Sequence, residues 1–209
     1  MFDPMGVPRR QGRLDDREVA KCLIKKYNFL VVKDTHEILV YENGIYRAGG
    51  EELIWSEVEE SLDMDTSNHF VKEVVGHIER SKIVSLKDFD SDPYVLNLKN
   101  GLYHLKTGQV TAHDPKYYSK IQLPVNYDPL ARSKEFERFM TAILPDLDQR
   151  LLTIDLFASC LWRTNTLKKN GMFVGDTDSG KSTYLSLISA TLGIDNVSNV
   201  SLRARADRT

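Results

Sequence analysis

The sequence contains few cysteines, no long apolar run and no excess of charge of one sign. The two cysteines, Cys22 and Cys160, stand far apart in the sequence. They form neither a disulfide framework nor a zinc-ligand pattern, and their scarcity fits a reducing compartment. No apolar run reaches the ~18 residues of a membrane span, and the first residues lack the apolar segment of a secretory signal. We therefore expect a cytoplasmic protein, in the host cytoplasm if the protein is viral.

The composition is typical of a folded globular protein. The chain has 209 residues, of which 41% are hydrophobic and 28% are charged, which is enough for one or two domains with cores. The formal net charge of -2 does not exclude a nucleic-acid partner, because binding follows local basic patches rather than the sum over the chain.

Hydrophobic periodicity and turn residues predict helices mixed with short antiparallel strands. Apolar residues recur at helical spacing, several times after an Asp or Ser that can cap a helix, over 16–27, 51–62, 68–78, 134–143 and 145–161. Strands are expected at 29–32, 37–41 and 45–47, the last two joined by the hairpin turn Asn43-Gly44. The alternation over 95–111, broken by Asn100-Gly101 and Thr107-Gly108, predicts a small β-meander.

Residues 175–183, Gly-Asp-Thr-Asp-Ser-Gly-Lys-Ser-Thr, match the phosphate-binding P-loop pattern Gly-x4-Gly-Lys-[Ser/Thr]. A predicted strand at 171–174 precedes the loop, and a predicted helix at 181–192 follows it and ends at Gly193. The two loop glycines allow backbone N–H groups to approach a phosphate chain closely, and the helix dipole points at it. We expect Lys181 to contact the β- and γ-phosphates of ATP and Ser182 to complete the Mg²⁺ coordination.

All nine residues of this loop are predicted to form the nucleotide site: Gly175, Asp176, Thr177, Asp178, Ser179, Gly180, Lys181, Ser182 and Thr183. The carboxylates of Asp176 and Asp178 should point away from the phosphates, because they would repel them. No apolar strand ending in a Walker B acid follows the loop within the 209 residues. We therefore expect the N-terminal part of a longer ATPase, with no catalytic residue in this part and no appreciable ATP hydrolysis by it.

Two weaker patterns favour structural roles. His69 and His77 stand on one predicted helix, but the sequence supplies no carboxylate or thiol that completes a metal-ligand set with them, so solvated or packing histidines are expected. Asp63 and Asp65, followed by Ser67 and His69, superficially resemble the paired acids and Ser-x-His of archaeo-eukaryotic primases. A helix end followed by a Ser cap is the expected structure here.

A longer set of motifs resembles the phage, plasmid and poxvirus primase–helicases. Residues 95–108 contain the pattern Asn-x-x-Asn-Gly-x5-Thr-Gly of that family. The family-like segments continue in order along the chain, with 113–119, 123–129, 131–136 and 196–202. The segment from Ala20 to Tyr46, with its hairpin, resembles the start of the same accessory domain. The resemblance extends over roughly residues 15–202.

This resemblance implies a superfamily 3 helicase with an AAA+-like motor. Such a protein assembles as a homo-hexamer, binds ATP and Mg²⁺ between subunits, and translocates on single-stranded or forked DNA during replication. The implied fold is an α+β accessory domain followed by the start of an α/β P-loop domain. The implied organisation is a disordered tail at 1–14, the accessory domain at 15–130, a helical linker at 131–165 and the start of the ATPase domain at 166–209.

A second function stays open at this stage. The chain could be a truncated, non-hydrolysing module for DNA binding or oligomerisation, with a vestigial P-loop. Extension of the reading frame past Thr209 separates the two hypotheses. An apolar strand that ends in acidic residues would support the motor, and a stop codon would support the module.

Overall fold

The computed structural model describes residues 15–61, 67–162 and 168–198, which form helices and short strands. They divide into two units. Unit 1 comprises the residues up to Ser91 together with His113–Lys120, and unit 2 comprises Asp92–Ala112 together with the residues from Ile121 onward. Residues 15–130, expected as one accessory domain, contribute to both units. The tail predicted at 1–14 and the acids Asp63 and Asp65 lie outside the described residues.

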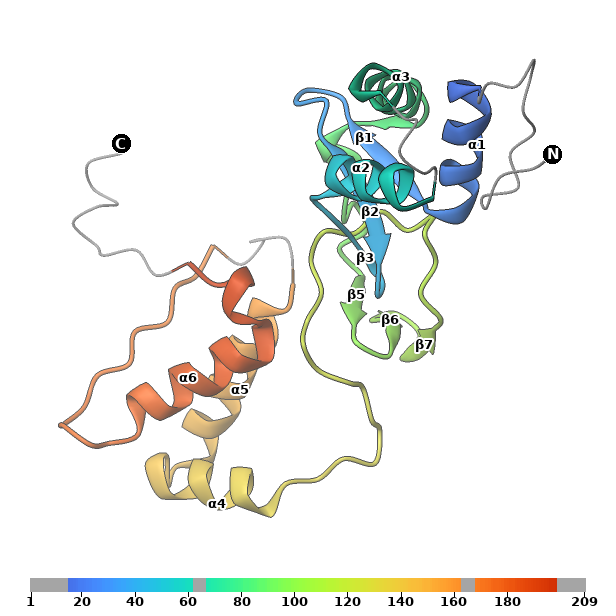
Figure 1. Ribbon diagram of the computed structural model, residues 1–209. Coiled ribbons are helices and arrows are strands. Elements are labelled where there is room, and N and C mark those ends of the chain that lie inside the picture. Colours follow the sequence, from blue (N-terminus) through green and yellow to red (C-terminus); the bar gives the residue numbers. More distant parts are fainter. Residues whose placement is uncertain (1–14, 62–66, 163–167, 199–209) are drawn as a thin grey trace. The chain divides into compact units, whose positions relative to one another are not determined.

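Unit 1 is an α+β layer structure around a four-stranded sheet. Its elements are α1 (Asp16–Lys26), β1 (Phe29–Val32), β2 (Ile38–Glu42), β3 (Ile45–Arg47), α2 (Gly50–Ser61), α3 (Asn68–Glu79), β4 (Ile83–Val84) and the 3₁₀ helix η2 (Leu86–Asp88). The strand order is β3-β2-β1-β4, with β4 parallel to β1 and the other pairs antiparallel. Figure 1 shows α1, α2 and α3 gathered around β1 and β2. The predicted hairpin is confirmed, since Asn43 and Gly44 have the positive φ angles of 49° and 94° that such a turn requires.

Both faces of this sheet are covered, which explains why all four residues of β1 are buried. Successive strand residues point to opposite faces. Phe29 and Val31 therefore join the core that the three helices cover, whereas Leu30 and Val32 join a second core. The second core also contains Phe89 and packs against Tyr118 from the segment 113–120. That segment thus closes the face that the helices leave open.

Tyr41 packs against the second core, and its buried hydroxyl has no partner among the described residues. Burial raises the pKa of this phenol, and the carboxylate of Asp114 adds to the effect. A desolvated hydroxyl without a hydrogen bond costs roughly 1–3 kcal/mol. The neighbouring Tyr46, whose ring centroid lies 5.0 Å away, instead donates from its hydroxyl to the carbonyl oxygen of Pro115 at 2.7 Å.

Removal of these two hydroxyls should therefore change stability in opposite directions. Tyr41→Phe is expected to raise the free energy of unfolding by about 1 kcal/mol, because it removes an unsatisfied polar group. Tyr46→Phe is the matched control, and it should lower that free energy by about 1 kcal/mol because a hydrogen bond is lost. Urea unfolding of the two variants and the wild type measures both changes. Destabilisation of similar size in both variants would contradict the prediction.

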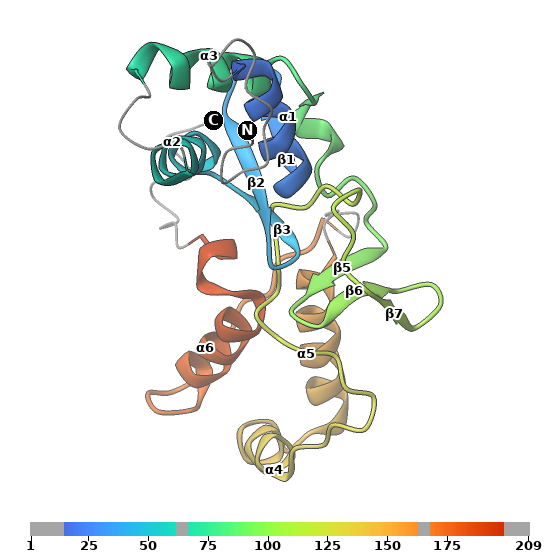
Figure 2. The same cartoon turned by 45° about the vertical axis from the view of Figure 1, so that its right-hand side comes forward.

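Unit 2 combines a small meander with a group of helices. Its elements are β5 (Val95–Leu98), β6 (Gly101–His104), β7 (Gln109–Thr111), α4 (Lys134–Ile143), α5 (Leu147–Cys160), α6 (Lys181–Leu192) and the 3₁₀ helix η3 (Ile194–Asn196). The three strands form the predicted antiparallel meander in the order β5-β6-β7. Leu96, Leu98 and Leu123 form its core, against which Leu161 and Leu192 pack from the ends of α5 and α6. In both views α6 runs beside α5 (Figure 2).

Most predicted elements agree with the structure to within a residue or two. Each of the helices α1, α3, α4 and α5 begins after a capping side chain that accepts a backbone N–H bond: Asp15, Ser67, Ser133 and Asp146. The structure confirms a mixed α+β architecture with small sheets. Within the described part of the chain, every helix falls short of the length and apolarity that crossing a bilayer requires.

Candidate functional site

The segment before the predicted P-loop is not a strand, which corrects the sequence prediction for 171–174. Residues 168–176 carry no regular secondary structure. The side chains of Met172 and Val174 are each 84% exposed. A strand requires a hydrogen-bonded neighbour, and the described residues supply none here. The segment instead lies against α5, where a Cβ at Gly171 would collide with Leu156.

The loop itself makes a tight turn that ends in the helix α6. Asp178 and Gly180 both have positive φ angles, of 63° and 82°. At Gly180 there is a second reason for glycine besides the backbone angle. A Cβ there would lie 2.5 Å from the side chain of Ile143 on α4. Glycine is therefore the residue that both the backbone angle and the close helix contact demand.

The first turn of α6 leaves backbone N–H groups without an intrahelical acceptor. The amide of Tyr184 bonds to the carbonyl oxygen of Gly180 at 2.9 Å, so the amides of residues 181–183 precede the first helical bond. Gly180, at the N-cap position, provides no side-chain cap. The amides and the positive end of the helix dipole are thus available to an anion.

Lys181 closes the loop over this helix start. Its Nζ donates to the carbonyl oxygens of Gly175 at 2.9 Å and Asp176 at 2.6 Å, and to the Oγ of Ser179 at 2.9 Å. The described residues place no carboxylate oxygen within 4.0 Å of this ammonium group. The side chain therefore holds the loop in a wrapped form through neutral acceptors, and none of the ion pairs among the described residues includes it.

The structure brings part of the predicted set together through one side chain. The Lys181 ammonium group contacts Gly175, Asp176 and Ser179. Apart from Gly180 and Lys181, all residues of the loop are exposed. The Ser182 hydroxyl lies in the first turn of α6, and it is a hard oxygen ligand of the kind that Mg²⁺ accepts. The residues present thus fit a magnesium nucleotide, in which the phosphates would supply the remaining oxygen ligands.

Tyr184 anchors the helix that follows the loop, and no sequence motif singles it out. This residue is 1% exposed. Its hydroxyl donates to the carbonyl oxygen of Thr153 on α5 at 2.8 Å, and its ring centroid lies 5.5 Å from that of Phe173. Tyr184 is the fourth residue of α6. The sequence shows an aromatic residue there but does not indicate which residue of α5 it contacts.

Loss of the Tyr184 hydroxyl should change the free energy of unfolding by an amount that depends on pH. Burial raises the pKa of this phenol above its usual value of 10.0, and the electrostatic influence of Cys160 adds to the rise. Near neutral pH, Tyr184→Phe should lower the free energy of unfolding by about 1 kcal/mol. Above pH 10 the unfolded tyrosine loses its proton before the folded one does, so the wild type loses stability as the pH rises.

The difference between wild type and Tyr184→Phe should therefore shrink above pH 10. Urea unfolding at neutral pH and above pH 10 measures it, and Tyr94→Phe, which removes a hydroxyl from a 36% exposed ring of the same unit, is the control. A difference that grows with pH would contradict the assignment.

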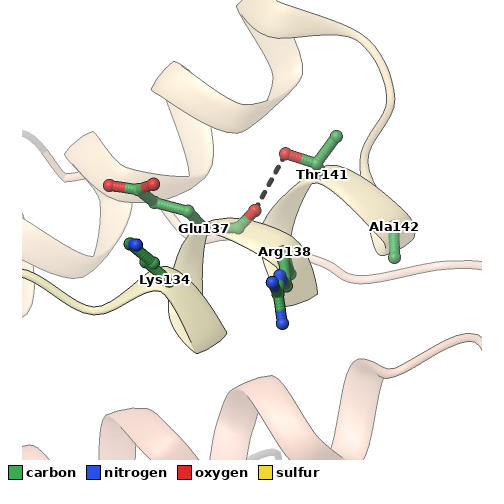
Figure 3. A pocket seen from close by; sticks show the side chains of 5 residues that line it. All are labelled: Lys134, Glu137, Arg138, Thr141 and Ala142. Carbon is green, nitrogen blue, oxygen red and sulfur yellow. Dashed lines mark hydrogen bonds between the residues drawn. The ribbon is translucent and has the colours of Figure 1, made fainter.

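A separate hollow lies on α4 and is lined by Lys134, Glu137, Arg138, Thr141 and Ala142. Figure 3 shows that all five side chains come from this one helix, with the Thr141 hydroxyl donating to the carbonyl oxygen of Glu137 at 2.8 Å. Within the described part of the chain, all the lining residues belong to α4, so we assign no ligand to this hollow.

Comparison with known families identifies the N-terminal part of the chain. Residues 17–145 match the family described as D5 N terminal like. The chain therefore belongs to this family of primase–helicase N-terminal domains. The matched residues end before the loop at 175–183, so the family assignment and the loop geometry are independent observations.

One relative comes from a mimivirus. Over 114 residues the chain is 27% identical to the protein named "Putative helicase L207/L206" of Acanthamoeba polyphaga mimivirus. The aligned region is 52% of this chain and 12% of that protein. The chain thus spans a small part of the length of this relative.

Proposed function

We propose that the chain binds ATP with Mg²⁺ at residues 175–183 and contributes the first part of a helicase motor. The observation that supports this most directly is the position of Lys181. Its ammonium group, which has no carboxylate partner among the described residues, closes a turn whose following helix begins without a side-chain cap. An ammonium charge and several backbone N–H groups at one helix start form a phosphate-binding arrangement.

In this arrangement each residue type has a separate task. The amides of the first turn of α6 would bind phosphate oxygens, and Lys181 would exchange its loop acceptors for the β- and γ-phosphates. Ser182 would hold Mg²⁺, whose charge offsets the charge of the triphosphate. Gly180 lets the turn lie close to α4, where a Cβ would collide with Ile143.

Titration with a fluorescent ATP analogue, with and without Mg²⁺, tests this proposal. We expect saturable binding that Mg²⁺ strengthens. ATP and ADP should compete with the analogue and adenosine should not, because the described contacts recognise phosphates. Equal competition by adenosine, or no saturation at millimolar analogue, would sink the proposal.

The carboxylate of Asp178 should weaken this binding. Two unit charges about 5 Å apart in water repel by roughly 0.8 kcal/mol. Removal of the Asp178 carboxylate charge from the neighbourhood of the phosphates should therefore raise ATP affinity about fivefold. Asp178→Asn is the suitable variant, since Asn tolerates the positive φ of 63° found here. Asp195→Asn, an exposed position elsewhere in unit 2, should have no effect. The gain should decrease at 1 M salt, where charges are screened within about 3 Å.

We further propose that the whole protein acts on single-stranded or forked DNA as a homo-hexamer. The family match and the name of the mimivirus relative support this context. The affinity of the chain for single-stranded DNA at several salt concentrations tests the DNA contact. Affinity that falls steeply with salt supports phosphate contacts, and a flat dependence argues against them.

A further inference from the structure

A second cluster of ligating side chains lies in unit 1, separate from the loop at 175–183. Asp16, Glu73 and His77 each offer one ligand atom, and these three atoms all lie within 4.8 Å of one another. Two carboxylates thus lie beside His77, where the sequence led us to expect none that would complete a ligand set with His69 and His77. Glu73 stands four residues before His77 on the same helix, and Asp16 comes from a different helix.

The backbone holds these three residues on rigid elements. Glu73 and His77 are one turn apart on α3, so their side chains share a face. Asp16 is the first residue of α1. The two helices pack through a common core that includes Val19 and Leu23 of α1 with Val74 and Ile78 of α3, and they lie side by side in Figures 1 and 2. Ligands on packed helices are positioned better than ligands on loops.

The polar contacts already orient two of the three groups. The Oδ1 atom of Asp16 accepts a hydrogen bond from the amide of Arg17 at 2.9 Å. The other oxygen, Oδ2, lies 3.5 Å from Nε2 of His77. On the far side of the imidazole, a guanidinium nitrogen of Arg80 lies 3.4 Å from Nδ1. The carboxylate and the imidazole thus face each other with Nε2 inward.

The donor set determines which metal fits. One imidazole nitrogen and two carboxylate oxygens suit zinc, whereas Mg²⁺ and Ca²⁺ prefer oxygen alone. The two carboxylate charges match the charge of Zn²⁺. Zinc bonds of about 2.0–2.2 Å separate tetrahedral ligand atoms by roughly 3.4 Å. The exposed side chain of Glu73 can close the remaining distance by a change of rotamer.

We propose that Asp16, Glu73 and His77 bind a zinc ion that joins α1 to α3, with water as the fourth ligand. The competing arrangement is a metal-free histidine whose Nδ1 accepts from Arg80 while Nε2–H faces the Asp16 carboxylate, and it needs neither Glu73 nor a metal. Arg80 distinguishes the two. Zinc on Nε2 leaves a hydrogen on Nδ1, which requires an acceptor rather than a cation.

Titration of the full chain with zinc chloride, followed by calorimetry without nucleotide, tests the proposal. We expect one saturable site, with affinity at least about tenfold weaker in His77→Gln, Glu73→Gln and Asp16→Asn, since each removes one of three protein ligands. His69→Gln is the matched control, because it removes an exposed histidine from the first turn of the same helix. Arg80→Gln should raise the affinity severalfold, because Gln can accept the Nδ1 hydrogen.

Two further measurements test whether the ion binds the folded state and whether thiols take part in its coordination. Zinc should raise the midpoint of thermal unfolding of the wild type but not of His77→Gln, because the ion binds the folded state. Alkylation of Cys22 and Cys160 should leave zinc affinity unchanged, which excludes thiol ligands. Absence of saturation up to about 1 mM zinc, equal affinity in His77→Gln, or loss of binding on alkylation would overturn the proposal.

Discussion

Replacement of Lys181 by alanine should weaken ATP binding by roughly a hundredfold. A hydrogen bond to a charged group contributes about 1.5–3 kcal/mol, and a loss of about 2.8 kcal/mol corresponds to a factor of one hundred. Lys181 acts twice in the proposed site. It supplies the charge for the phosphates, and it holds the loop through Gly175, Asp176 and Ser179.

Further variants separate these two contributions. Ser179→Ala keeps the charge and removes one loop contact, so it should weaken binding by less than about tenfold. Lys169→Ala removes an exposed lysine shortly before the loop and should leave affinity unchanged. Circular dichroism should show unchanged helix content in all three variants, because none of the replaced side chains belongs to a hydrophobic core. Equal ATP affinity of Lys181→Ala and wild type would refute the phosphate site.

Replacement of Leu30 by alanine should be the most destabilising of the stability changes considered. Leu30 is fully buried in the middle of β1, which pairs with β2 on one side and β4 on the other. Leu→Ala at such a site costs about 2.7–5 kcal/mol, since transfer energy is lost and a cavity forms. That is a large part of the roughly 5–15 kcal/mol by which domains are stable.

The matched control is Leu86→Ala, because Leu86 belongs to unit 1 but is 47% exposed. It should change the free energy of unfolding by less than about 1 kcal/mol. Urea unfolding followed by circular dichroism measures both variants. A cost at Leu86 as large as the cost at Leu30 would contradict the burial of the two sites described here.

The elements that the sequence predicted well are those specified by contacts close in the chain. Asp15, Ser67, Ser133 and Asp146 each cap a helix through an amide two or three residues away. Asn43-Gly44 forms the hairpin because both residues tolerate positive φ. Such local interactions depend on few residues, so their pattern can be read directly.

The elements predicted wrongly or missed depend on partners far away in the chain. Residues 171–174 have the composition of a buried strand, yet the described residues offer no strand to pair with them. The two-residue β4 exists through its parallel pairing with β1, and it is too short to produce a periodic pattern. Residues 113–120 return to unit 1, where Tyr118 covers the second face of the sheet.

The sequence by itself determined the helices, the hairpin, the meander and the position of the proposed phosphate-binding loop. Backbone angles and i to i+4 spacing are local properties, and these features follow from them. The tertiary structure alone decided which carboxylate faces His77, which carbonyl receives the Tyr184 hydroxyl and how Lys181 closes its loop. These depend on how helices pack and how side chains turn, which spacing along the chain does not encode.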